Sequence, residues 1–152
     1  MQFHIFTLEQ NGESVYLLTP FSRNDMPAAL SQQAFAGKLI DPLQGPFMEN
    51  VAVNPEFLVV LHETVRDVMV EDPEVIAEAK EQPNGYVFIV DRRAPEGKDI
   101  PKEDIIGIFL VSDRKTDVSR YRPNPDYKLI SEKGFAQLPE SAEIELLKRL
   151  GE

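Results

Sequence analysis

The sequence contains few residue patterns that could perform chemistry, and a histidine within a predicted helix begins the first of them. His62-Glu63 matches the start of the HExxH zinc-protease motif, in which two histidines one helical turn apart bind the metal. The fifth position is Arg66 rather than histidine, so this helix would offer one ligand and a cation. The motif therefore does not predict a zinc site, and a structural role for His62 is favoured.

A second pattern resembles a metal-dependent nuclease site. Asp91 follows a predicted strand, and Glu96-Gly97-Lys98 comes shortly after it. In such sites two carboxylates hold a metal ion and a lysine orients the nucleophile. Here the second element lies in a loop with proline and glycine, and its distance from Asp91 is too short for a strand–turn–strand arrangement. The pattern leaves a small metal-dependent hydrolase as an alternative function.

Other catalytic patterns are missing from the sequence. It has no G-x-S-x-G elbow, and its eight glycines are scattered rather than gathered into a phosphate-binding loop. It has no cysteine, and its two histidines, His4 and His62, are not placed beside a candidate serine. The sequence therefore predicts no catalytic residues, no metal ligands and no cofactor.

The amino-acid composition and net charge of the chain limit the classes of partner that it can bind. The chain has 152 residues, 42% hydrophobic and 28% charged, which is typical of one soluble globular domain. Its 26 acidic and 16 basic residues give a formal charge of -10, whereas nucleic acids and anionic membranes attract clustered cations. No apolar run reaches the roughly 18 residues of a membrane-spanning helix, and the start, MQFHIFTLEQ, does not resemble a signal peptide. We expect one cytoplasmic domain over residues 1–152 that binds neither nucleic acid nor membranes.

Turn and cap signals organise the first third of the chain. Residues 2–9 alternate in polarity and, with 15–18, flank Asn11-Gly12, a pair typical of a two-residue hairpin turn. Asn24 or Asp25 is expected to cap a short helix that continues to about Phe35. An ordered loop with buried apolar residues is expected next. Its candidates for burial are Phe35, Leu39, Ile40, Leu43 and Phe47.

Two helices are predicted in the middle of the chain. Asn54-Pro55 and Asp72-Pro73 each join a capping residue to a proline at the first helical position, and a glutamate follows each pair. Apolar residues recur at three-to-four spacing behind both signals. The residues expected to face inward are Leu58, Leu61, Val65, Val68 and Met69 in the first helix and Val75, Ile76 and Ala79 in the second.

The remaining elements determine the fold class. The apolar runs 86–90 and 105–111 predict two interior strands, and Gly107 marks a bulge or a close backbone approach. A third short strand is predicted at 127–130, and an amphipathic helix at 139–150 has Ile144, Leu147 and Leu150 on its apolar stripe. The order predicts an α+β fold: a mainly antiparallel sheet, formed by the N-terminal hairpin and two or three later strands, with helices packed on it.

The excess of acid is concentrated in the helical pair. Residues 61–90 hold seven acids against two bases. Two interpretations are open: a solvated face that keeps the protein soluble, or a negative patch that speeds the capture of a basic partner. The predicted partner-binding acids are Glu63, Asp67, Glu71, Asp72, Glu74 and Glu78.

Several segments together resemble a known group of proteins. They read AFAGKLIDP, NPEFLVVLHETV, GYVFIVDRRAPEG, IPKEDIIGIFLV and YRPNPDYKLISEKGF, and lie within roughly residues 34–138. A D-R-x-x-P turn, a P-x-E-D-I-I-G strand start and an N-P-x-Y stretch occur among them as a set. This order is similar to small immunity proteins encoded beside Rhs-type and other polymorphic toxins, including those of type VI secretion, used in interbacterial competition.

The resemblance implies a binding function without catalysis. Immunity proteins commonly cover the active site of a cognate toxin, and many such toxins are nucleases with cationic clefts. Tight binding needs central anchors, and Tyr121, Arg122 and Tyr127 are the exposed-loop candidates, their alternative role being to pack the loop against the sheet. We therefore expect an immunity protein that neutralises a secreted toxin domain. The alternatives are a hydrolase built from Asp91, Glu96 and Lys98, or an adaptor that loads the toxin without inhibiting it.

Overall fold

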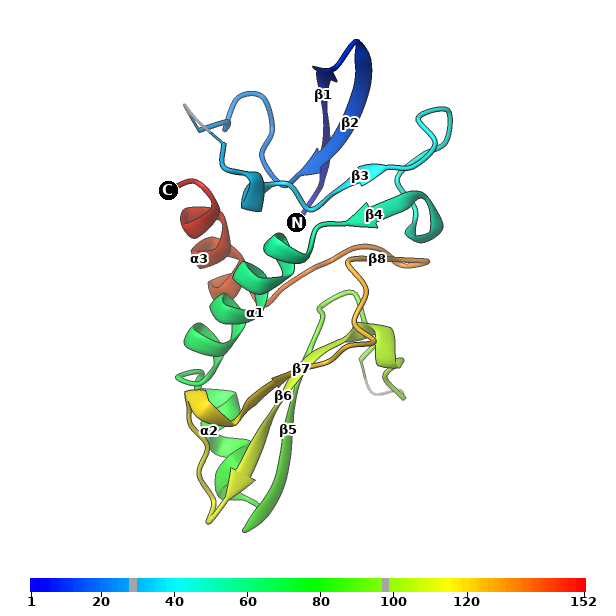
Figure 1. Cartoon of the computed structure of the whole chain (residues 1–152). Coiled ribbons are helices and arrows are strands. Elements are labelled where there is room, and N and C mark those ends of the chain that lie inside the picture. Colours follow the sequence, from blue (N-terminus) through cyan, green and yellow to red (C-terminus); the bar gives the residue numbers. More distant parts are fainter. Residues whose placement is uncertain (28–29, 97–98) are drawn as a thin grey trace.

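The computed structural model describes residues 1–27, 30–96 and 99–152, and its elements form the predicted α+β fold (Figure 1). The first sheet has the order β1-β2-β3-β4, the second β5-β6-β7, and every pairing is antiparallel. The strands of these sheets are β1 His4–Gln10, β2 Glu13–Thr19, β3 Gly37–Leu39, β4 Val51–Val53, β5 Asn84–Val90, β6 Ile105–Ser112 and β7 Tyr121–Pro123. A small hairpin adds β8 Ile130–Ser131 and β9 Gly134–Phe135.

Three α-helices in the described residues join the sheets: α1 Pro55–Met69, α2 Pro73–Lys80 and α3 Glu140–Leu150. Figure 1 shows α1 crossing between the two larger sheets with α3 beside it, while α2 lies against β5. The inner faces of α1 and α3 are fully buried at Leu61, Val65, Leu146 and Leu150, so the core lies between the layers. None of the helices in the described ranges combines the length and apolar composition needed to cross a bilayer.

The local signals at the hairpin and at both central helices are confirmed. Asn11 and Gly12 have φ values of 53° and 81°, the pair of left-handed residues that a type I′ turn between twisted strands requires. The side chain of Asn54 accepts a hydrogen bond from Glu56 N at 3.1 Å, and Asp72 accepts one from Glu74 N at 2.9 Å. Each cap satisfies a backbone donor that the first helical turn leaves unpaired.

The prediction of a helix that continues to about Phe35 is wrong: in the described part of this segment, only the short 3-10 helix Gln32–Ala34 forms. The segment forms hydrogen bonds with β2 in place of a helix: Ala36 N donates to Leu18 O at 2.7 Å, and Thr19 Oγ1 donates to Ala34 O at 3.1 Å. The segment therefore joins the edge of β2 and continues into β3. Residues 28 and 29 of the predicted helix lie outside the described part.

Several predictions of burial are also wrong. The loop residues Ile40, Leu43 and Phe47 are 63%, 94% and 41% exposed. On the helices, Ile76 and Ile144 face solvent at 41% and 63% exposure. Leu150 is buried as predicted, and Ala142 and Leu146 complete the buried stripe of α3, because α1 contacts that side of the helix.

Two strand predictions also need correction. Residues 86–90 form an edge strand rather than an interior one, with β6 alone at the centre of its sheet. The third strand of this sheet is Tyr121–Pro123, and the predicted strand 127–130 contributes only Ile130 to β8. An apolar run does not show which strand will have neighbours on both sides.

Gly107 is confirmed as a point of close approach. The β5–β6 register shifts between Ile89 and Val90, opposite this glycine, and the Tyr121 ring lies directly over it. A Cβ at Gly107 would lie 2.6 Å from Tyr121 Cζ, well inside van der Waals contact.

Gly107→Ala is therefore expected to lower the free energy of unfolding by about 2 kcal/mol, because it overpacks a buried ring. Gly45→Ala is the matched control, since a Cβ there meets nothing within 4 Å, and its effect should stay within about 0.5 kcal/mol. Urea denaturation measures both variants. Equal stability of the two would show that the Tyr121 ring moves away without cost.

Candidate protein-binding site

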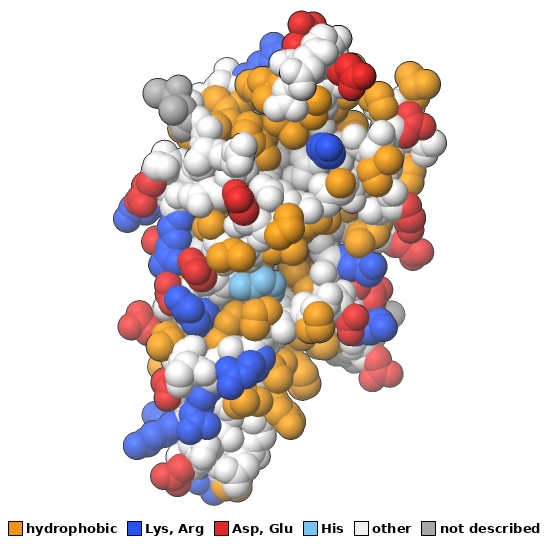
Figure 2. Space-filling model, viewed as in Figure 1, with side chains coloured by type: hydrophobic (Ala, Val, Ile, Leu, Met, Phe, Trp, Pro, Cys, Tyr) orange, Lys and Arg blue, Asp and Glu red, His pale blue; other side chains and the backbone are white. Residues whose placement is uncertain are grey.

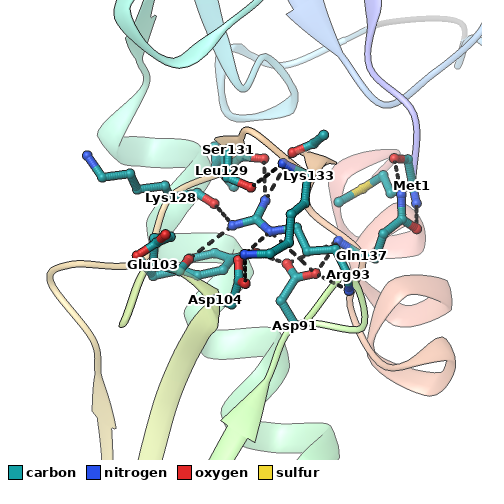
Figure 3. A network of polar contacts seen from close by, with 12 residues as sticks. Met1, Asp91, Arg93, Glu103, Asp104, Lys128, Leu129, Ser131, Lys133 and Gln137 are labelled. Carbon is teal, nitrogen blue, oxygen red and sulfur yellow. Dashed lines mark hydrogen bonds and ion pairs between the residues drawn. The ribbon is translucent and has the colours of Figure 1, made fainter. Parts of the chain in front are cut away.

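The buried arginine Arg93 organises the polar centre of the molecule (Figure 3). Its side chain is 3% exposed, and its Nε donates to Asp104 Oδ1 at 2.8 Å while Lys133 Nζ donates to Asp104 Oδ2 at 2.8 Å. Burial raises the pKa of Asp104, but the bonds from Lys133 and Arg93 outweigh it, so the pKa lies below its usual range. The remaining guanidinium donors reach the backbone carbonyls of Glu103, Lys128, Leu129 and Gly134. Arg93 thereby joins the end of β5 to the β8–β9 hairpin.

Asp91, the proposed metal ligand of the hydrolase alternative, belongs to the same polar centre. It is 1% exposed and accepts hydrogen bonds from Arg93 N at 2.9 Å, Gln137 N at 3.0 Å and Tyr127 Oη at 2.8 Å. Burial raises the pKa of Asp91 despite these bonds, and burial together with the nearby Asp91 raises the pKa of Tyr127. The hydroxyl of Tyr127 therefore stays protonated and donates a hydrogen bond to the carboxylate of Asp91.

Of the three residues of the hydrolase alternative, the structure describes Asp91 and Glu96, which line one small hollow after β5. Within residues 1–27, 30–96 and 99–152, no three His, Asp or Glu side chains gather as a metal would require. Glu96 is exposed, and Lys98 lies outside the described residues. The bonds around Asp91 give it a structural role, connecting β5 to the segment before α3.

The two tyrosines predicted as exposed anchors are buried. Tyr121 and Tyr127 are 7% and 9% exposed, so the prediction of exposure is wrong and the alternative of packing the loop against the sheet holds. Tyr121 Oη lies 2.8 Å from His62 Nδ1. Arg122 is exposed, and its Nη1 donates to Ser119 O at 2.8 Å and Tyr121 O at 2.9 Å.

The predicted acids do not form one patch. Glu63 lies on α1, whereas Glu74 and Glu78 line a groove between α2 and β5 that also contains Arg92. Asp67 is neutralised by Arg66 at 2.8 Å and Arg149 at 3.0 Å. The hydrogen bond from Arg66 lowers the pKa of Asp67, against the effect of burial and with help from Arg149.

Two of the remaining acids have different roles. Asp72 caps α2, and its oxygen is engaged by the backbone of that helix. Glu71 is exposed at the turn between α1 and α2. Of the six predicted acids, only Glu63, Glu71, Glu74 and Glu78 lack an ion pair or cap within the described residues and can offer charge to a partner.

The exposed side of α1 connects two surface hollows, and we call this region the α1 face. Glu56, Val59 and Glu63 follow one another along this side of the helix. The upper hollow, about 400 Å³, is lined by Leu8, Leu17, Phe35, Lys38, Ala52 and Glu56, among others. The lower hollow, about 480 Å³, is lined by Val59, His62, Glu63, Val118, Tyr121 and Pro123, among others. Figure 2 shows hydrophobic side chains gathered along this face, with charged groups scattered between them.

The lower hollow has an uncharged floor. Burial lowers the pKa of His62 to about 4, so the ring is neutral at pH 7, and burial raises the pKa of Tyr121. The tyrosine O–H can then donate to His62 Nδ1, which pairs the hydroxyl with that ring nitrogen without a charge. Among the described residues, the charged side chains that line this hollow are the exposed Glu63 and the half-buried Arg66, at its rim. Such a floor suits an apolar side chain from a partner.

Sequence reasoning missed this face, although one signal for it was present. Glu56, Val59 and Glu63 recur at three-to-four spacing on the side opposite the buried stripe of α1. An apolar residue between acids on a polar helix face is a weak sign of a contact surface, because single exposed apolar residues are common. The hollows themselves depend on segments far apart in the chain. Comparisons with protein-family models, curated proteins and solved structures find no match to this chain.

Proposed function

We propose that this chain is an immunity protein that binds a cognate secreted toxin in the cytoplasm and neutralises it by covering its active site. The observation that carries the proposal is the α1 face, which combines apolar hollows with a charged rim. Protein interfaces have this arrangement, with a desolvated apolar centre surrounded by polar residues. The resemblance of the sequence to immunity proteins supports the same function.

The charge of the chain also supports the proposal. A net charge of -10 favours encounter with a basic surface, such as the substrate cleft of a nuclease. Complementary charge mainly raises the association rate, which matters for an inhibitor that competes with a lethal reaction.

Reversing the unpaired acids tests the contribution of this charge. The variant Glu71→Lys/Glu74→Lys/Glu78→Lys leaves the Asp72 cap in place and should lower the association rate with the toxin domain about tenfold at low salt. Stopped-flow mixing at two salt concentrations measures the effect, which should shrink at high salt. Reversal of Glu9, Glu13 and Glu132 gives the same change in net charge elsewhere. An equal loss in both variants would assign the effect to net charge rather than to the helical acids.

A growth experiment tests the function itself. The toxin-like protein that co-purifies with the tagged chain from its native lysate is expressed in a susceptible host, with and without this chain. The proposal predicts that growth stops with the toxin alone and is restored when the two are expressed together. Binding without protection would indicate the adaptor alternative, and the absence of any toxin partner would contradict the proposal.

A further inference from the structure

The loop between β3 and β4, residues 40–50, displays its apolar side chains to solvent. Ile40, Leu43 and Phe47 are 63%, 94% and 41% exposed. Figure 1 shows this loop projecting beyond the β1–β4 sheet. These three exposed apolar side chains belong to one short loop, and exposed apolar side chains that gather in one region mark interaction sites more often than single ones do.

The loop is held in shape by a buried asparagine. Asn50 is 4% exposed; its Oδ1 accepts from Asp41 N at 2.8 Å, and its Nδ2 donates to Asp41 O and Gly45 O at 3.0 Å each. The carboxylate of Asp41 in turn accepts from Leu43 N at 3.0 Å and Gln44 Nε2 at 3.1 Å. The polar groups of the loop thus bond to one another, while its apolar side chains point outward.

This arrangement lowers the cost of binding through the loop. A mobile loop must be ordered when it binds, and that ordering consumes part of the interaction free energy. Here internal hydrogen bonds fix the backbone before any contact is made. An apolar side chain on such a fixed backbone has the properties of a central interface anchor.

The acidic residues of the loop indicate the kind of surface that it binds. Between Leu39 and Val53 the sequence has two acids, Asp41 and Glu49, and no base. An anionic membrane would repel this loop, and so would a second copy of a chain with net charge -10. An apolar cleft with basic residues at its rim is complementary to it.

We propose that the 40–50 loop is the anchor that inserts Leu43 into an apolar, basic-rimmed cleft of the toxin domain. This inference rests on the proposed function. The loop extends from β3 and β4, whose residues Gly37, Lys38, Ala52 and Val53 line the upper hollow. One partner can therefore contact the loop and the α1 face together.

The test compares two exposed apolar residues. Leu43→Asn removes the anchor without adding charge, and Ile144→Asn, at 63% exposure on α3, is the matched control. Both side chains are exposed, so neither change should disturb folding, which thermal melting verifies. With the toxin domain identified by growth protection, calorimetric titration should give a Kd about 30-fold higher for Leu43→Asn and unchanged for Ile144→Asn.

Each other result overturns the inference. Equal affinity of both variants, with wild-type protection intact, would overturn the anchor and leave the proposed function standing. Failure of the wild-type chain to bind or neutralise any toxin would overturn both. If the wild-type chain binds phosphatidylglycerol vesicles and Leu43→Asn does not, the loop contacts a membrane instead. If sedimentation shows that the wild-type chain self-associates and Leu43→Asn does not, the loop contacts a second copy of the chain.

Discussion

Arg93→Met should lower the free energy of unfolding by about 4 kcal/mol, since removing one partner of a buried ion pair typically costs about 3–5 kcal/mol. The guanidinium is the donor to Asp104 and to four backbone carbonyls, and both side chains are almost fully buried. Methionine fills much of the volume but donates nothing. Asp104 would keep only Lys133 as a cationic partner among the described residues.

Urea denaturation monitored by circular dichroism measures this loss. Arg92→Met is the matched control, because Arg92 is the exposed neighbour in the chain and should change stability by no more than about 0.5 kcal/mol. A loss below about 1 kcal/mol for Arg93→Met would contradict the view that this network holds the β8–β9 hairpin on the second sheet.

The second large effect is a loss of stability in mild acid that depends on His62. Burial lowers the pKa of this residue to about 4 in the folded chain, whereas an exposed histidine in the unfolded chain keeps its ordinary pKa of 6.5. Between these pH values the unfolded chain binds a proton that the folded chain does not. Stability therefore falls as pH decreases from about 6.5 to about 4, by about 3 kcal/mol in total, and this contribution changes no further below about pH 4.

Comparison with His62→Gln isolates this effect. The pKa values of Asp67 and Asp104 are lowered in the folded chain, so their protonation reduces the free energy of unfolding at more acidic pH in both proteins. The pKa of Asp91 is raised, so its protonation has the opposite effect on the free energy of unfolding, again in both proteins. The free energy of unfolding is measured at several pH values between about 4 and 7 for each protein. The wild type should show a steeper decline than the variant. Parallel pH profiles would mean that the histidine is not desolvated as the structure implies.

The parts of the fold that the sequence predicts are those with local causes. Asn11-Gly12 forms its turn because both residues accept left-handed backbone. Asn54 and Asp72 begin helices because their side chains bond backbone donors two residues ahead. Gly107 lies where a neighbouring ring leaves no space for a side chain. The turn and the two caps depend only on neighbouring residues, whereas the ring over Gly107 belongs to Tyr121 on another strand.

The errors arise where distant segments decide the outcome. The segment around Phe35 joins the sheet instead of forming a helix, because Ala36 N donates to Leu18 O and Thr19 Oγ1 donates to Ala34 O. Ile144 is exposed because α1 packs on another side of α3. Tyr121 and Tyr127 are predicted in exposed loops, yet His62 on α1 and Asp91 just after β5 hold their hydroxyl groups inside.

The candidate site shows the same division. The sequence predicts the acid-rich helical pair and the Asp72 cap, but only the fold shows that Asp67 is paired with Arg66 and Arg149. The hollows of the α1 face bring together residues from different elements, and the spacing of Glu56, Val59 and Glu63 on α1 is a weak sign of them in the sequence.

The most direct test of the proposed function is a titration of toxin activity. The purified toxin domain, identified by growth protection, is mixed with increasing amounts of this chain, and the remaining toxin activity is measured after each addition. We expect activity to fall in proportion to the chain added and to reach zero at a fixed stoichiometric ratio. Full activity in the presence of a saturating, stable complex would contradict neutralisation by covering of the active site.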